Sequence, residues 1–143
     1  MRTGISIKIT RPDRRRLEAI GFAVIRPSRF KQPTDLRVVR VPCSGRVDPL
    51  FVVKALLSGA DGVLVSGCHP RDCHYSEGNF YARRRLEMLK RFLPFIGIDD
   101  RRFHYTWVSA SEGQKWQQTV TAFTKQIHEL GPRQDKEEIA VER

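Results

Sequence analysis

Gly62-Val-Leu-Val-Ser66 is the stretch that decides the fold of this chain, because it is a continuous apolar run followed by another glycine. Such a run is typical of a strand in a parallel sheet, where both faces of the strand are covered. Upstream, Asp48-Pro49 predicts a helix N-cap followed by the first helical residue, and Gly59 suits the end of that helix. Further upstream, the segment 36–41 is short, rich in β-branched residues and bounded by prolines, which predicts another strand.

Downstream of this stretch, the apolar spacing predicts a helix over about residues 79–93, which Pro94 should end or kink. Alternating aromatic residues predict a strand over 101–108. The last helix shows one clean apolar face; Ser109 or Ser111 is expected to cap it, and the Gly-Pro pair that follows should stop it.

The order β-α-β-α-β-α predicts parallel strands joined by right-handed crossovers. We therefore expect an α/β fold, a small parallel-sheet three-layer domain of the Rossmann or flavodoxin-like kind. The sequence divides into three parts: an atypical basic N-terminal segment over residues 1–35, the α/β domain over 36–132 and a polar C-terminal tail over 133–143. Within the first part, short patterns suggest strands at 5–9 and 21–25 and the start of a helix at 11–18.

The net charge of +10 is concentrated near the N-terminus. Residues 1–46 hold twelve Lys and Arg against three Asp and Glu, whereas residues 47–143 hold fourteen against thirteen. A basic arm indicates nucleic acid or an acidic partner, and a solvated N-terminus is the plainer alternative. The arginines lack clustered aromatic neighbours and no helix-turn-helix pattern is evident, which argues against nucleic acid. The Arg-rich face of helix 79–93 is either solvated or a dock for an acidic partner.

The length of 143 residues fits one domain. No apolar run approaches the roughly 18 residues that a membrane span needs, and the start does not resemble a signal peptide. We therefore expect a cytoplasmic protein. Nothing in the sequence matches a P-loop or a dinucleotide-binding glycine motif.

The three cysteines carry the most specific chemical signal. Their odd number argues against a disulfide framework. Cys43 follows the strand over 36–41, while Cys68 and Cys73 follow the strand 62–66. Because ligands gather at the carboxyl ends of parallel strands, all three should reach one edge of the sheet, and they can share a site if the two strands are neighbours.

Thiolates suit iron–sulfur clusters, zinc and copper(I). The C-x4-C spacing of Cys68 and Cys73, without a second pair, is not that of a zinc finger, and the C-x-x-C of thioredoxin-like enzymes is absent. Gly45, Gly67 and Pro70 can turn backbone amides toward sulfur, and Arg46 and Arg71 can offset the charge of a cluster. The alternative is a buried Cys43 with two incidental loop thiols.

Two histidines share the cysteine-containing loop. His69 and His74 are candidate ligands, because imidazole replaces thiolate in some clusters. Histidines more often hydrogen-bond to backbone or carboxylate groups, for which Asp72 is the nearby candidate.

Four segments resemble one family. They are Val-Pro-Cys-Ser-Gly-Arg-Val-Asp-Pro at 41–49, Gly-Ala-Asp-Gly-Val-Leu-Val-Ser-Gly-Cys-His-Pro-Arg-Asp-Cys-His-Tyr at 59–75, Glu-Gly-Asn at 77–79 and Trp-Val-Ser-Ala-Ser-Glu-Gly at 107–113. They are similar to the iron–sulfur (delta) subunit family of methyl-viologen-reducing hydrogenase, which is associated with heterodisulfide reductase. The match extends from about Arg37 to Pro132.

The resemblance implies a small α/β subunit that carries a [2Fe–2S] cluster and catalyses no bond chemistry alone. Such subunits relay electrons between a NiFe hydrogenase or formate dehydrogenase and a flavin-containing heterodisulfide reductase, in anaerobic metabolism such as methanogenesis. Cys43, Cys68 and Cys73 match cysteines of the family's motifs.

The N-terminus departs from the family pattern, which usually opens with a short strand followed by a run such as Cys-Cys-x-x-Cys. This chain has no cysteine before Cys43, and a [2Fe–2S] cluster normally needs four ligands. Four explanations stay open: His69 or His74 completes the site, a partner chain supplies a ligand, the cluster is lost and a docking subunit remains, or the first residues come from a misassigned start or shifted frame. The last two are favoured, because the departure is confined to one end.

Overall fold

The computed structural model describes residues 5–6, 17–22, 33 and 36–133. The strands are β1 (Ile5–Ser6), β2 (Leu17–Phe22), β3 (Leu36–Val38), β4 (Gly62–Gly67) and β5 (Phe103–Trp107). The α-helices are α1 (Pro49–Leu57), α2 (Gly78–Phe92) and α3 (Gly113–Leu130). Three short 3-10 helices complete the described elements: η1 (Ser44–Arg46), η2 (Leu93–Ile96) and η3 (Asp100–Arg102).

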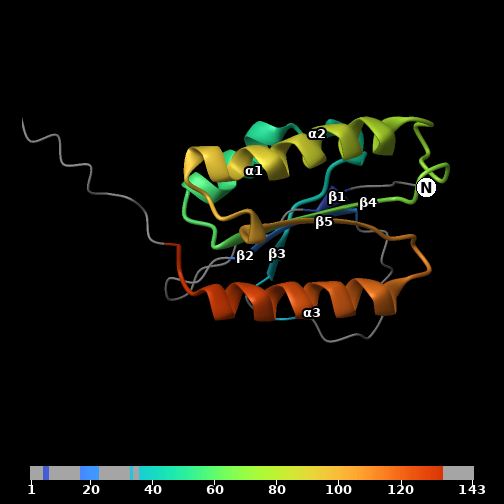
Figure 1. The fold of residues 1–143 in the computed structure, drawn as a ribbon. Helices are drawn as coiled ribbons and strands as arrows, with labels where there is room; N and C mark the ends of the chain where they lie inside the picture. Colours follow the sequence, from blue (N-terminus) through green and yellow to red (C-terminus); the bar gives the residue numbers. More distant parts are fainter. Residues whose placement is uncertain (1–4, 7–16, 23–32, 34–35, 134–143) are drawn as a thin grey trace, which may run out of the picture.

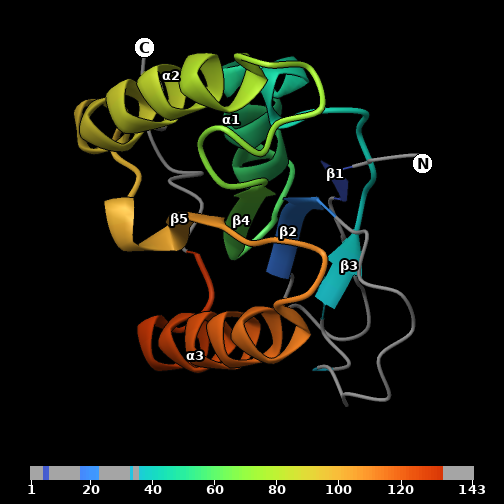
Figure 2. The same ribbon diagram turned by 90° about the vertical axis from the view of Figure 1, so that its right-hand side faces the viewer.

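The sheet has the order β1-β2-β4-β5, with β3 paired to β2 (Figure 2). The pairs β2–β3, β2–β4 and β4–β5 are parallel, and β1 joins β2 antiparallel. Leu17 of β2 pairs with both Leu36 of β3 and Gly62 of β4. A site shared by Cys43 and Cys68 was expected to need neighbouring strands. The two strands that precede these cysteines, β3 and β4, are not neighbours, because β2 lies between them.

The helices cover both faces of the sheet, with α1 and α2 on one side and α3 on the other (Figure 1). The continuous apolar run of β4 divides between these layers as strand alternation dictates. Val63 and Val65 belong to the apolar cluster under α1 and α2, and Leu64 to the cluster under α3. The predicted α/β class with a small parallel sheet is thus confirmed. The finer assignment to a Rossmann or flavodoxin-like three-layer fold stays a prediction.

Most helix boundaries follow the local signals. The Asp48 carboxylate accepts a hydrogen bond from the Leu50 amide at 2.8 Å, and α1 begins at Pro49. Helix α2 ends at Phe92 before the 3-10 turn that contains Pro94. Helix α3 stops at Gly131, whose φ of 69° is in the left-handed region that favours glycine.

Three expectations at element ends are wrong. The N-cap of α3 is Glu112, which makes no side-chain capping bond, rather than Ser109 or Ser111. The strand expected over 36–41 covers only 36–38, because β2 pairs with those three residues alone. The strand expected over 101–108 covers 103–107, because residues 100–102 form η3.

The N-terminal segment contributes to the sheet. Ile5–Ser6 forms β1, and Gly21 and Phe22 belong to β2, whereas 7–9 and 23–25 lie outside the described residues. The helix start expected over 11–18 is wrong at its last two residues, which lie in β2, and 11–16 are not described. The domain boundary at residue 36 stays a prediction, although β2 precedes it and pairs on both sides.

No helix in the described part of the chain is long and apolar enough to cross a membrane.

Candidate functional site

The three cysteines lie together at the carboxyl edge of the sheet. Cys43 and Cys68 are buried, Cys73 is half-buried, and all three are free thiols. The Cys43 and Cys73 sulfur atoms are 3.7 Å apart, although 30 positions separate the two residues. The Cys68 thiol interacts with the Cys73 thiol as well. Segments that are distant in the sequence therefore form one cluster of thiols.

The three thiols come together although β3 and β4 are not adjacent, because the turn η1 packs against both β4 and α2. This contact is very close. A Cβ atom on Gly45 would lie 2.9 Å from the Gly78 backbone, and one on Gly78 would lie 2.3 Å from the Cys43 sulfur. Because real Cβ contacts are never that short, both positions need glycine for the thiols to meet.

Backbone amides point at the sulfur atoms. The Gly45 amide donates to the Cys43 sulfur at 3.4 Å. The amides of Tyr75 and Asn79 donate to Cys73, and Asn79 belongs to the first turn of α2, whose unpaired amides carry partial positive charge. The arrangement therefore favours negative charge on Cys73.

The three thiols differ in pKa. Burial, followed by hydrogen bonding to Cys73, raises the pKa of Cys68 to about 12. Burial also raises the pKa of Cys43, against the opposing effect of the Gly45 amide. Burial acts upward on Cys73 too, but the amide bonds from Tyr75 and Asn79 and the two thiol donors together lower its pKa. Of the three thiols, Cys73 is thus the one whose surroundings favour loss of its proton, and burial opposes that loss at Cys43 and Cys68.

The loop from Cys68 to α2 holds strained backbone. Arg71 and Ser76 have φ angles of 75° and 58°, and they are the non-glycine residues with positive φ in the described part of the chain. Each such conformation costs roughly 1–2 kcal/mol. Strain of this kind persists only where the surroundings hold it, and it concentrates at functional sites.

Asn79 fixes the start of this loop from inside. Its side chain is buried, and Nδ2 donates to the carbonyls of Cys68 at 3.3 Å and His69 at 2.6 Å. Its Oδ1 has no hydrogen-bond partner, and neither does the buried hydroxyl of Ser66. The Ser44 hydroxyl is also buried and lowers the pKa of Cys43. Unpaired buried oxygens are costly, so their concentration beside the cysteines marks a specialised site.

The histidines behave differently from each other. His69 Nε2 lies 2.5 Å from a Glu112 carboxylate oxygen, which also accepts the Ser109 amide at 2.8 Å. These two contacts, the Ser109 amide first, lower the pKa of Glu112 to about 2. The carboxylate partner of His69 is thus Glu112 rather than Asp72. The His74 side chain is exposed and contacts the Tyr75 ring edge-on.

Sequence reasoning missed Glu112, Gly78 and Asn79 as parts of this site. For Glu112 a signal exists, because Ser109-x-x-Glu112 has the spacing of a capping box, and the Glu112 carboxylate reaches back to the Ser109 amide as in that motif. Gly78 and Asn79 fall in the Glu-Gly-Asn segment that resembles the family, but that segment alone does not indicate that Gly78 packs against Cys43 and Gly45.

The donor chemistry of the site fits an iron–sulfur cluster, and the number of donors falls short. Sulfur ligands surrounded by amide donors are the environment that such clusters use. The three cysteines supply three of the four ligands that a [2Fe–2S] cluster normally needs. Among the described residues, no group of three or more His, Cys, Asp or Glu side chains is arranged to hold a metal ion. Binding of a cluster by these cysteines stays a prediction.

A pocket of about 460 Å³ opens over Cys43. We call it the Cys43 pocket, and it is lined by Pro42, Cys43, Gly45, Arg46, Tyr75, Gly78 and Tyr81. It shares Tyr81 with a smaller groove of about 190 Å³ that also contacts Glu77, Phe80 and Arg84. The thiol cluster therefore meets the surface between η1 and the start of α2.

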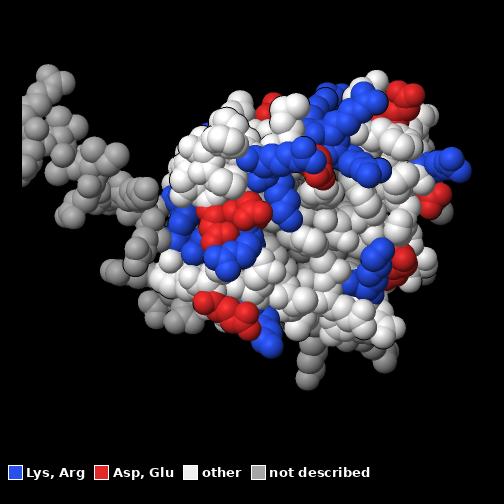
Figure 3. Space-filling view, in the orientation of Figure 1, with Lys and Arg blue, Asp and Glu red and all other residues white. Residues whose placement is uncertain are grey.

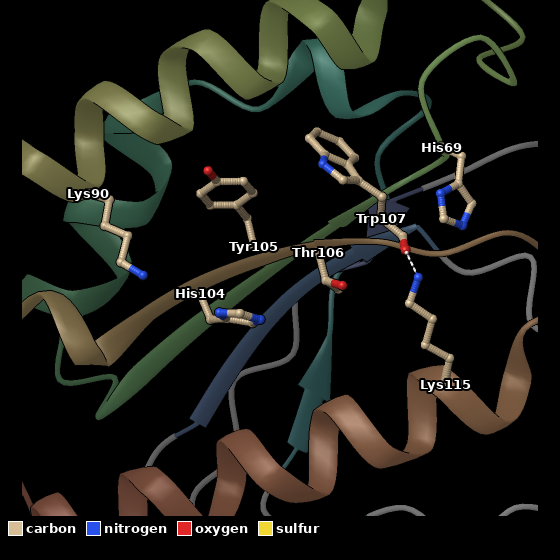
Figure 4. Close-up of a pocket in the computed structure, with 7 residues that line it drawn as sticks. All are labelled: His69, Lys90, His104, Tyr105, Thr106, Trp107 and Lys115. Atoms are coloured by element: carbon tan, nitrogen blue, oxygen red, sulfur yellow. Dashed lines mark hydrogen bonds between the residues drawn. The ribbon is translucent and has the colours of Figure 1, made fainter.

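A second pocket, of about 430 Å³, runs along β5 between α2 and α3 (Figure 4). Four consecutive residues of β5, 104–107, line it together with His69, Lys90 and Lys115. The Tyr105 and Trp107 rings point toward α2, and the Lys115 ammonium donates to the Trp107 carbonyl at 2.8 Å. This pocket holds no cysteine, and a lysine already engages its backbone edge.

Positive charge gathers over α2 on the face shown in Figure 3. The basic residues of this helix are Arg83, Arg84, Arg85, Lys90 and Arg91. Arg85 contacts the thiol region directly, since its guanidinium donates to the Gly45 carbonyl at 3.0 Å.

Comparison with known proteins gives one family. A profile of methyl-viologen-reducing hydrogenase, delta subunit, matches residues 17–131. The chain is 51% identical over 104 residues to the iron-sulfur subunit of the F420-non-reducing hydrogenase of Archaeoglobus profundus, covering 73% of this chain and 76% of that protein. It is 45% identical over 104 residues to the vhc iron-sulfur subunit of the F420-non-reducing hydrogenase of Methanococcus voltae, covering 73% of this chain and 72% of that protein.

A third relative is much longer, and we call it the long reductase subunit. It belongs to the ferredoxin:CoB-CoM heterodisulfide reductase of Methanosarcina mazei, and the chain is 48% identical to it over 105 residues, covering 73% of this chain and 13% of that protein. The same kind of domain thus occurs as a separate subunit and within a larger polypeptide. The profile match begins at Leu17, the first residue of β2, and it spans most of the chain. The chain belongs to the family of the delta subunit of methyl-viologen-reducing hydrogenase.

Proposed function

We propose that this chain is an electron-transfer subunit that carries a [2Fe–2S] cluster on Cys43, Cys68 and Cys73. It relays electrons from a hydrogenase or a formate dehydrogenase to the flavin-containing subunit of a heterodisulfide reductase. When bound, such a cluster accepts and returns one electron at a time. The chain itself makes and breaks no bonds in this proposal.

The observation that carries the proposal is the convergence of three free thiols from separate segments, with 3.7 Å between the Cys43 and Cys73 sulfur atoms. Amides that donate to Cys43 and Cys73 stabilise negative charge on sulfur, as bound iron requires. A merely structural cysteine does not need two glycines at a backbone contact or strained residues in its loop. The printed names of the relatives, which include iron-sulfur subunits, support the same chemistry.

The choice of partners rests on the relatives. Two are named as hydrogenase subunits, and in Methanosarcina mazei a similar segment is part of the long reductase subunit itself. Domains that are fused in one organism and separate in another commonly work together. We therefore infer that the acceptor-side partner of this chain is a heterodisulfide reductase protein related to the long reductase subunit.

The fourth ligand needs a source. Because β2 and β4 are parallel, β2 ends at Phe22 on the same edge of the sheet where β4 leads to Cys68. A cysteine run after a first strand, as in the family pattern, would start there, but residues 23–42 contain no cysteine. His69 has only Nδ1 left, because Glu112 engages Nε2, and His74 is exposed. For the chain as it stands, a histidine or a partner chain has to complete the site.

The test is the content of iron and acid-labile sulfide in anaerobically purified protein, with its ultraviolet–visible spectrum. We expect about two irons and two sulfides per chain. Cys43→Ser, Cys68→Ser and Cys73→Ser should each remove them. His69→Gln and His74→Gln are the matched variants, since loss of iron in one of them identifies the fourth ligand. Iron-free protein from an anaerobic preparation would refute the proposal.

A second candidate function is a cluster-free docking subunit of the same complex. It is favoured by one observation, that the described residues hold no complete set of ligands for a metal ion. It predicts that the triple Cys→Ser variant still assembles with the hydrogenase and heterodisulfide reductase subunits. Loss of assembly in a folded triple variant would exclude it.

A further inference from the structure

Cys43 lines the Cys43 pocket, whereas no cysteine lines the pocket along β5. Electron transfer between proteins slows steeply with distance, so a partner must approach a redox site where that site is nearest to the surface. Cys43 itself is only 6% exposed, and this pocket is the surface hollow that it lines. This makes the pocket the natural point of contact.

The rim of the Cys43 pocket is aromatic. Tyr75 and Tyr81 are 56% and 47% exposed, and Phe80, in the adjoining groove, is 41% exposed. Isolated exposed apolar residues are ordinary, but a contiguous group beside a pocket is typical of an interaction site. Tyrosine and arginine are also the residues that most often dominate the energy of protein interfaces.

The charge around the pocket is basic. Arg46 lines the pocket and Arg84 lines the adjoining groove, and both side chains are exposed. Arg85 lies beside them through its bond to the Gly45 carbonyl. Glu77 is the one carboxylate among the lining residues of the two hollows. A partner that matches this surface presents carboxylates around an apolar centre.

We propose that the electron-transfer partner of this chain docks over the Cys43 pocket, with an apolar side chain in the pocket and carboxylates against Arg46, Arg84 and Arg85. The inference rests on the proposed function and adds the place and chemistry of the contact. The occupant is an acidic protein surface, for which the relative of the long reductase subunit from the same genome is the probe.

Two adjacent arginines on α2 provide a matched test. Arg84 lines the groove with Tyr81, whereas Arg83 acts on Glu87 and Tyr105, on the β5 side of the helix. Arg84→Glu and Arg83→Glu change the net charge equally and affect long-range steering alike. We expect Arg84→Glu to raise the dissociation constant about tenfold or more at 0.1 M salt, and Arg83→Glu to change it less than about threefold.

Tyr81→Ser separates the apolar contact from the charged one. Its effect should also be about tenfold, and it should persist at 0.5 M salt, where that of Arg84→Glu shrinks because exposed charges are screened. Circular dichroism and thermal unfolding establish that each variant is folded. Equal effects of Arg83→Glu and Arg84→Glu, or no effect of Arg84→Glu and Tyr81→Ser, would overturn the proposal.

Iron content measured on the same samples keeps this inference apart from the proposed function. If Arg84→Glu retains iron and loses docking, the electron-transfer function and the docking surface both stand. If no preparation holds iron but docking still depends on Arg84 and Tyr81, the electron-transfer function fails and the docking surface stands. Self-association of the chain alone in sedimentation experiments, abolished by Arg84→Glu, would assign the surface to a second copy and overturn the proposal.

Discussion

The α3 side of the sheet and the cysteine end of the molecule are packed by different means. Under α3, buried apolar side chains fill the layer: Leu36, Leu64, Val108, Trp116, Val120, Phe123 and Ile127. The buried Thr124 hydroxyl, on α3 itself, donates to the Val120 carbonyl at 2.8 Å. At the cysteine end, backbone touches backbone at Gly45 and Gly78.

The buried oxygens show the same contrast. The Asn79 Oδ1, beside the cysteine loop, has no partner, while the Thr124 hydroxyl on α3 is satisfied. Apolar burial accounts for the α3 layer without reference to any function. At the cysteine end, close glycine contacts and an unpaired buried oxygen lower the stability of the fold. This indicates that the geometry there serves the thiols. Substitutions on the two sides should therefore fail in different ways.

The largest expected effect on stability comes from Phe123→Ala on α3. Phe123 is 3% exposed and its ring also faces His104 across a 6.0 Å centroid separation. Removing it leaves a cavity and should lower the free energy of unfolding by about 3–5 kcal/mol. Urea unfolding measures the loss. Iron per folded chain should not change, and its loss in folded protein would show that the two sides are coupled.

Gly78→Ala should affect the binding of iron, which Phe123→Ala is expected to leave unchanged. The new Cβ would lie 2.3 Å from the Cys43 sulfur and 3.3 Å from the Cys73 sulfur, so the thiols must separate. We expect a cost of about 1–3 kcal/mol in unfolding free energy and loss of bound iron. Gly97→Ala is the control, because its Cβ meets nothing within 4 Å and only its φ of 77° causes strain, about 1–2 kcal/mol. Iron retained by Gly78→Ala would contradict the role given to this contact.

Local sequence signals predicted much of this fold, for physical reasons that are easy to state. Asp48 and Pro49 encode the start of α1 within three residues, and Gly131 encodes the end of α3. The apolar run of β4 encodes a strand covered on both faces, and all its residues are buried. Each of these signals depends on neighbours along the chain, so no knowledge of the tertiary structure was needed.

The remaining features depend on contacts between distant segments. The place of β2 between β3 and β4 follows from pairing that its short, weakly patterned sequence does not specify. The sequence placed the cysteines at one edge of the sheet, but it did not reveal that η1 has to press on Gly78 for Cys43 to reach Cys73.

Asn79→Ala and Thr124→Val compare a buried polar residue on each side. Losing Asn79 leaves the carbonyls of Cys68 and His69 without their side-chain donor, so we expect a loss of about 1–2 kcal/mol. Thr124→Val should cost under about 1 kcal/mol, because the Val120 carbonyl lies within α3 and has a helical partner. Urea unfolding of both variants tests the difference. Equal costs would mean that Asn79 does not hold the cysteine loop.

The smallest expected effect is the pH dependence that Glu112 brings to the cysteine side. Its pKa is lowered from 4.5 to about 2, first by the Ser109 amide and then by His69. A carboxyl whose folded-state pKa is depressed stabilises the fold above the unfolded-state pKa, and this contribution is lost as the pH falls through the folded-state value. The free energy of unfolding should therefore fall between about pH 4.5 and about 2.

Glu112→Gln removes that titration and keeps an oxygen that accepts the Ser109 amide. In urea unfolding from pH 6 to 2, the variant should lose stability less steeply than the original chain over this window. Asp99 is the control, because its pKa is also lowered, mainly by Arg101, and it lies next to η3, away from the cysteines. Asp99→Asn should flatten the curve without altering the cysteine loop, whereas Glu112→Gln should also change the ring-proton shifts of His69. Identical pH profiles for Glu112→Gln and the original chain would show that the bond between His69 and Glu112 does not tie the cysteine loop to α3.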